Sequence, residues 1–201
     1  MSVSRVLLYG ILLLGSSAAA SGKPLTCEQY KDRLGGALLA TGERKVDVPK
    51  FTLGFSDPVR GRRYDWGTLN LTGTLKCGPG DEFEEVYVSA AFERKDQFAD
   101  TVQNFIVVSA ATVCALTTNG APACSDFSRS MLQDSLEQIG RAYNRGATRP
   151  SGLTDRDVVP GAKAELTAAS TLVTLLIGPG RGATIDEERQ PLAASPANAR
   201  P

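Results

Sequence analysis

The chain has 201 residues, and its 22 basic and 22 acidic side chains give a formal net charge of zero. Proteins that neutralise nucleic-acid phosphates usually carry a basic excess, so this balance argues against nucleic acid as a partner. The chain contains no histidine, which excludes Ser-His-Asp and Cys-His catalysis and any histidine metal ligand. Catalysis would have to come from carboxylates, lysine or tyrosine.

The first twenty residues have the layout of a secretory signal peptide. Arg5 precedes an apolar run over residues 6–14, and small residues then lead to Ala18-Ala19-Ala20, the pattern of a cleavage site. The alternative is an uncleaved anchor, but the run is shorter than the about 20 apolar residues that a membrane span needs. We expect residues 1–20 to be removed, leaving an exported protein, periplasmic or extracellular, with no stable membrane span.

The remaining chain is long enough for one domain with a sizeable core. We assign residues 21–182 to this single domain. Residues 183–201 combine proline, alanine and charged side chains without periodicity, which predicts a disordered tail.

The four cysteines, an even number behind a signal peptide, predict two disulfides. Four cysteines allow three connectivities, which sequence alone does not distinguish. We favour Cys114–Cys124, because it closes a short segment with the turn residues Asn119-Gly120, and this leaves Cys27–Cys77. A zinc site is disfavoured because no C-x-x-C pair and no histidine is present, and we expect no cofactor.

A helix is predicted to begin after Thr26, which with Gln29 matches a capping box, and to stop at Thr41-Gly42. Gly35-Gly36 weakens this helix, and close approach of another backbone is the expected reason. Its predicted buried positions recur at helical spacing: Tyr30, Leu34, Ala37 and Leu38.

Three strands follow as a predicted antiparallel meander with one buried face. The first spans about 46–55 and changes phase at Pro49, with Leu53 and Phe55 expected to face inward. Residues 56–67 look like a loop. The second strand covers about 68–75, and the third alternates from Val86 to Phe92.

Two helices are predicted next. The first runs from about 96 to 118, and its uncharged stretch at 105–116 predicts burial on nearly all sides. The second begins with Ser125 as its N-cap and ends at Gly146. Pairing of the third and fourth cysteines would link the two helices into a hairpin.

Residues 161–178 fit two patterns. A helical period runs through them, yet 171–177 is rich in β-branched residues, and Gly178-Pro179-Gly180 ends the segment abruptly. We favour a strand over 171–177 and leave the helix as the alternative. The expected fold is therefore α+β: an N-terminal helix and an antiparallel sheet of three to five strands, packed against a helical hairpin.

One local cluster is a candidate binding surface, and arginine and aromatic side chains suit anions and sugar faces. The alternative is a loop with solvated arginines and a tryptophan that packs on the core. The cluster consists of Arg60, Arg62, Arg63, Tyr64 and Trp66.

The densest acidic group is Asp81, Glu82, Glu84 and Glu85. A carboxylate pair hydrolyses glycosides when the environment separates the two pKa values. Acids gathered in one turn are more typical of a solvated hairpin tip.

These observations predict an exported, disulfide-stabilised, non-catalytic binding or accessory protein. Its partner is expected to be an envelope component or another protein. The alternative is a histidine-free hydrolase using a carboxylate pair, and it requires two acids that converge in an apolar cleft.

Overall fold

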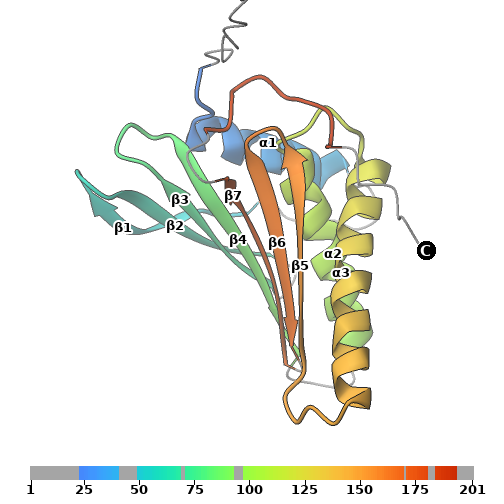
Figure 1. Ribbon diagram of the computed structural model, residues 1–201. Helices are drawn as coiled ribbons and strands as arrows, with labels where there is room; N and C mark the ends of the chain where they lie inside the picture. The colour runs from blue at the N-terminus through green and yellow to red at the C-terminus, as the bar shows by residue number, and fades with distance from the viewer. Residues whose placement is uncertain are drawn as a thin grey trace, which may run out of the picture.

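Three helices cover one face of a seven-stranded antiparallel sheet, so the fold is α+β with the expected N-terminal helix (Figure 1). The computed structural model describes residues 23–40, 49–68, 71–92, 97–169, 171–180 and 184–193. In chain order the elements are α1 (Cys27–Ala40), β1 (Thr52–Asp57), β2 (Gly61–Thr68), β3 (Leu71–Cys77), β4 (Phe83–Ala91), α2 (Phe98–Cys114), α3 (Ala121–Asn144), β5 (Ser151–Val159), β6 (Ala162–Ala169) and β7 (Leu172–Pro179). The expected signal peptide, the start of the expected first strand at 46–48 and the stop at Thr41-Gly42 lie outside these residues.

The sheet joins two meanders in the order β1-β2-β3-β4-β7-β6-β5. The chain runs through the first four strands, crosses the sheet as the α2–α3 hairpin, and returns at the far edge as β5. From this edge β6 pairs with β5 and β7 pairs with β6, and β7 also pairs with β4, with Val88 opposite Leu175. The core lies between this sheet and the helices, where residues such as Val86 and Ile177 are fully buried.

The expectation of three to five strands is too low, because β2, β5 and β6 were not predicted. Charged residues obscure the alternation of β2, which was expected to be a loop. In β5, Thr154 and Arg156 take up helix-facing positions, where they bond to α3. Residues 162–169 alternate strictly between buried and exposed, so the helical alternative for 161–178 is wrong and the strand over 171–177 is confirmed.

The capping box at the start of α1 is confirmed. The Thr26 amide donates to Gln29 Oε1 at 2.9 Å, and the Gln29 amide donates to Thr26 Oγ1 at 3.2 Å. The close approach expected at Gly35-Gly36 is not made at Gly36, where an added Cβ would meet nothing within 4 Å. Gly36 instead faces a cavity.

The two central helices form the expected hairpin. In α2 every residue from Val107 to Val113 is buried, as its lack of charge predicts. The start of α3 differs from the prediction, because Gly120 rather than Ser125 is the N-cap. Pro122 explains the earlier start, since proline fits the first helical turn, where its missing amide costs nothing. The helix ends before Gly146, whose φ of 86° is the left-handed conformation of a C-terminal stop.

Both disulfide pairings are confirmed. Cys27–Cys77 links the first residue of α1 to the last residue of β3, and Cys114–Cys124 links α2 to α3. These are called the α1–β3 disulfide and the α2–α3 disulfide below. Two disulfides are typical of proteins that fold in an oxidising compartment.

Residues 184–193, which the composition placed in a disordered tail, bond to three parts of the domain. Backbone hydrogen bonds run from Leu25 to Ile185 at 2.8 Å, from Thr118 to Gln190 at 2.9 Å, and from Ala193 to Val158 at 2.8 Å. Ile185 is buried. This C-terminal strap crosses the top of the molecule in Figure 1, from α1 toward the start of α3. Residues 194–201 lie outside the described chain.

No helix within the described ranges is long and apolar enough to cross a membrane.

Candidate binding surface

The five residues of the candidate cluster do not form one patch. Arg60 lies in the turn before β2 and the others lie on the strand, where successive side chains point to opposite faces. Tyr64 and Trp66 pair with Leu75 and Gly73 of β3, on the face that the helices cover. Arg63 lies on the other face.

Trp66 belongs to the core. It is only 5% exposed, and its ring lies 5.9 Å from that of Phe51. A Cβ added to Gly73 would lie 2.1 Å from the indole, so glycine leaves the space that the ring occupies. For this residue the packing alternative is confirmed.

Tyr64 and Arg62 join α1 and the β3–β4 turn to β2. The Lys31 Nζ atom lies 3.6 Å from the centre of the Tyr64 ring, in cation–π geometry. Arg62 Nη1 lies 3.6 Å from Asp81 Oδ1. The pKa of Arg62 is raised by its hydrogen bond with Tyr64 and, to a lesser degree, by the Asp81 carboxylate. Sequence inspection missed Lys31 and Asp81 because neither adjoins the cluster in the chain.

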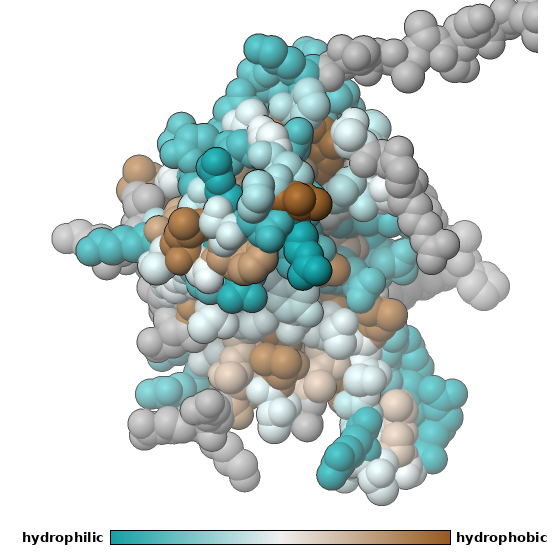
Figure 2. Space-filling model, turned by 90° about the vertical axis from the view of Figure 1, so that its left-hand side faces the viewer, coloured by the Kyte–Doolittle hydropathy of each residue, from teal (hydrophilic) through white to brown (hydrophobic). Residues whose placement is uncertain are grey.

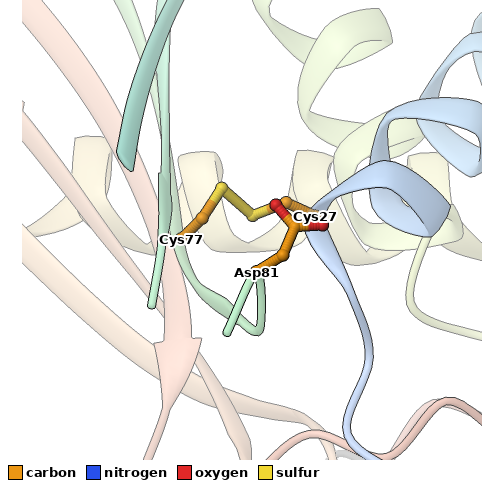
Figure 3. A group of neighbouring side chains, drawn as sticks. All are labelled: Cys27, Cys77 and Asp81. Atoms are coloured by element: carbon orange, nitrogen blue, oxygen red, sulfur yellow. A yellow bond between two sulfur atoms is a disulfide. The ribbon is translucent and has the colours of Figure 1, made fainter. Parts of the chain in front are cut away.

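Asp81 also lies beside the α1–β3 disulfide (Figure 3). Its φ of 70° places it in the left-handed region, in the tight turn between β3 and β4. Its carbonyl accepts a hydrogen bond of 2.8 Å from the Cys27 amide. Cys27, Cys77 and Asp81 are close enough together to hold a metal ion, but the two sulfurs are bonded to each other. Thiolates, not disulfide sulfurs, ligate metals. The disulfide and the Cys27–Asp81 hydrogen bond instead attach the start of α1 to the sheet.

Three of the four carboxylates in the acidic group at 81–85 have separate partners. Asp81 faces Arg62, and Glu85 forms an ion pair with Lys76. Glu82 Oε2 accepts a hydrogen bond of 2.9 Å from the Gly80 amide. Glu82 and Glu84 approach each other beside Gly78, but both are exposed, whereas a hydrolytic carboxylate pair needs an apolar cleft.

Carboxylates also stand alone in three cavities that the described residues form. The cavities include Asp32, Asp157 and Glu137 respectively, and each is lined by one carboxylate. The structure therefore adds no support to the carboxylate-pair hydrolase.

The outer strand carries exposed apolar residues that were expected to face inward. Leu53, Phe55 and Val59 are 54%, 44% and 80% exposed. The prediction that both side chains are buried is wrong. A bulge between them places Phe55 opposite Arg63 on the outer face. Leu53 lies opposite Tyr64 on the helix side but stays exposed, because β1 is the edge strand and lies farther from the helices than the strands that they cover (Figure 1). Figure 2 faces this side of the molecule and shows hydrophobic groups interspersed with hydrophilic ones.

The β1–β2 hairpin (residues 52–68) therefore exposes apolar and cationic side chains on both faces and at its turn. Phe55 and Arg63 share the outer face, Leu53 lies on the opposite face, and Val59 and Arg60 lie in the turn. The two arginines differ in their surroundings. Arg63 Nε lies 3.4 Å from Asp65 Oδ1, and both side chains are half exposed. Within the part of the chain that the structure describes, no carboxylate forms an ion pair with Arg60.

No protein-family model, curated protein or solved structure matches the chain. The chemistry of its own surfaces is therefore the basis for a function.

Proposed function

We propose that this is an exported, disulfide-stabilised, non-catalytic binding protein, and that the β1–β2 hairpin contacts a protein partner. The observation that carries the proposal is the exposure of Leu53, Phe55 and Val59 on one hairpin. Single exposed apolar residues are ordinary, but a group of them beside polar residues is typical of an interaction surface. Arginine and aromatic residues are also enriched at such surfaces.

The hairpin favours a partner segment that is extended and acidic. Among the described strands only β2 pairs with β1, so the outer edge of β1 offers backbone groups to an added strand. Arg60 lies in the turn that follows β1, Arg63 lies opposite Phe55 on β2, and both favour carboxylates. Backbone pairing would supply affinity, and the arginines would supply selectivity for acidic sequences.

Two further features support a binding role over a catalytic one. The absence of histidine removes the commonest general base. Asp81, Glu82 and Glu85 are engaged with separate cations and amides, and Glu82 and Glu84, which approach each other beside Gly78, are exposed and do not lie in a cleft.

Site-specific photo-cross-linking in the native host tests this proposal. A photoreactive phenylalanine analogue replaces Val59 in one strain and Tyr143 of α3, which is 70% exposed, in the control strain. We expect a discrete adduct from position 59 and none from position 143. Equal adducts from both positions, or none from position 59, would overturn the proposal.

A charge variant separates the hairpin from general surface effects. Arg60→Ala with Arg63→Ala should abolish the adduct at position 59 while the melting temperature stays unchanged, since exposed ion pairs contribute little stability. The control is Arg129→Ala with Arg141→Ala on α3, which removes two exposed arginines that each form an ion pair, as Arg63 does. An adduct that survives the hairpin variant would contradict the cationic part of the proposal.

A further inference from the structure

A cavity of about 500 Å³ lies between α1, the start of α3 and the C-terminal strap. This volume falls within the range of small-molecule sites. Gly36, Ala37 and Ala40 form its α1 wall, which is small and apolar. Arg33 and Arg189 bring charge to it from two segments that are distant in the sequence.

Neither arginine is matched by a carboxylate at ion-pair distance among the residues that the structure describes. Arg33 Nη2 donates to the Glu187 carbonyl oxygen at 2.6 Å, and no carboxylate among the described residues forms an ion pair with Arg33 or Arg189. The pKa of Arg33 is lowered by partial burial and then by the positive charge of Arg189, whereas the Glu187 charge acts in the opposite direction. Both guanidinium groups stay charged, so an anion between them would relieve their repulsion.

The start of α3 adds partial positive charge to the same cavity. Gly120 and Ala121 line it, and the helix has no side-chain N-cap. The first amides of a helix lack intrahelical acceptors and carry partial positive charge. Because Pro122 has no amide, the first such donor of α3 is the Ala121 amide. The neighbouring Asn119 does not cap them, because its Oδ1 accepts a hydrogen bond of 2.7 Å from the Leu192 amide.

We propose that this cavity binds a small organic anion. Its carboxylate or phosphate group would lie between Arg33 and Arg189, near the start of α3, and its apolar part would lie against the α1 wall. Asp32 also lines the cavity and disfavours ligands of high negative charge. The inference does not depend on the hairpin, so either proposal stands if the other fails.

Titration of the oxidised, exported protein followed by amide NMR tests the site. The probes are benzoate and phenyl phosphate, with benzamide as the neutral counterpart of benzoate. We expect saturable shifts of the Gly120 and Ala121 amides with at least one anion and none with benzamide. The anion that binds more tightly identifies the preferred group, carboxylate or phosphate. The double variant Arg33→Gln with Arg189→Gln should weaken the binding of that anion about tenfold or more.

A cavity-filling variant that stays folded distinguishes loss of the binding site from loss of the folded state. A Cβ at Gly36 meets nothing within 4 Å, so Gly36→Leu should occupy the cavity and abolish binding while raising the melting temperature through its helix propensity. The control is Gly140→Leu in α3, where a Cβ also meets nothing within 4 Å, and it should retain binding. The proposal is overturned if neither anion shifts these amides, if benzamide shifts them equally, or if folded Gly36→Leu protein binds normally.

Discussion

Replacing Gly152 of β5 with alanine should force α3 away from the sheet. A Cβ at this position would lie 1.9 Å from the Ser135 carbonyl oxygen, and the next two nearest atoms also belong to the α3 backbone. Ordinary contacts begin near 3.4 Å, so helix and strand would have to separate by about 1.5 Å, more than a well-packed interface accommodates without strain. A backbone obstacle of this kind has no rotamer that relieves it.

The cost has two parts. Overpacking by itself destabilises by about 1–3 kcal/mol. Separation would also stretch the hydrogen bond from Ser135 Oγ to Thr154 Oγ1, which is 2.9 Å long and buried, and the two bonds of Gln138 to the Leu153 backbone at 2.7 and 3.1 Å. Weakening the buried Ser135–Thr154 pair costs a further ~1–3 kcal/mol, whereas the exposed Gln138 bonds add little. With partial relaxation, we expect a loss of about 2–4 kcal/mol in the free energy of unfolding.

Urea denaturation of the oxidised protein, followed by far-UV circular dichroism, measures this loss. Gly140→Ala is the matched control, because an added Cβ there meets nothing within 4 Å and helix propensity should raise stability by about 1 kcal/mol. A change of less than about 0.5 kcal/mol in Gly152→Ala, the range of an ordinary surface substitution, would refute the steric argument. Equal losses in both variants would refute it as well.

Three other results are expected. A phosphine reductant under native conditions should reduce the α2–α3 disulfide before the α1–β3 disulfide. The reason is that Cys114 is half-buried, whereas Cys27 and Cys77 are both buried. Equal rates of alkylation at the two disulfides would contradict this order. Burial raises the pKa of Tyr30, so the unfolded chain releases this proton near pH 10 while the folded chain retains it. The contribution of Tyr30 to stability should therefore be constant below about pH 10 and fall above it. The slope of the free energy of unfolding against pH, above about pH 10, should be smaller in Tyr30→Phe and unchanged in Tyr143→Phe. Unchanged slopes in both variants would contradict the argument. The intact mass of the exported protein should show loss of residues 1–20 and no free thiols, whereas a retained N-terminus would contradict the signal-peptide interpretation.

Features that depend on neighbours in the chain were predictable. The Thr26–Gln29 capping box involves residues three positions apart, and the uncharged stretch of α2 implies burial wherever the helix packs. The two disulfide pairings followed from one short loop and the cysteines that remained. The cluster around Arg62, by contrast, lies on β2, a strand that the sequence pattern does not predict. Side chains along a strand alternate between its two faces, so the cluster is divided between the faces of the sheet.

The rest was decided by tertiary contacts. Arg156 is compatible with β5 because Ser130 Oγ of α3, 26 positions away in sequence, accepts its hydrogen bond at 2.6 Å. The C-terminal strap has the composition of a tail, yet its backbone bonds hold it to three segments, since such bonds require no particular side chain. The cavity between α1 and the strap exists only after these segments meet. Local patterns therefore determined the start of α1, the cross-links and the class of the fold, whereas the number of strands and both candidate binding surfaces were decided by partners that only folding brings together.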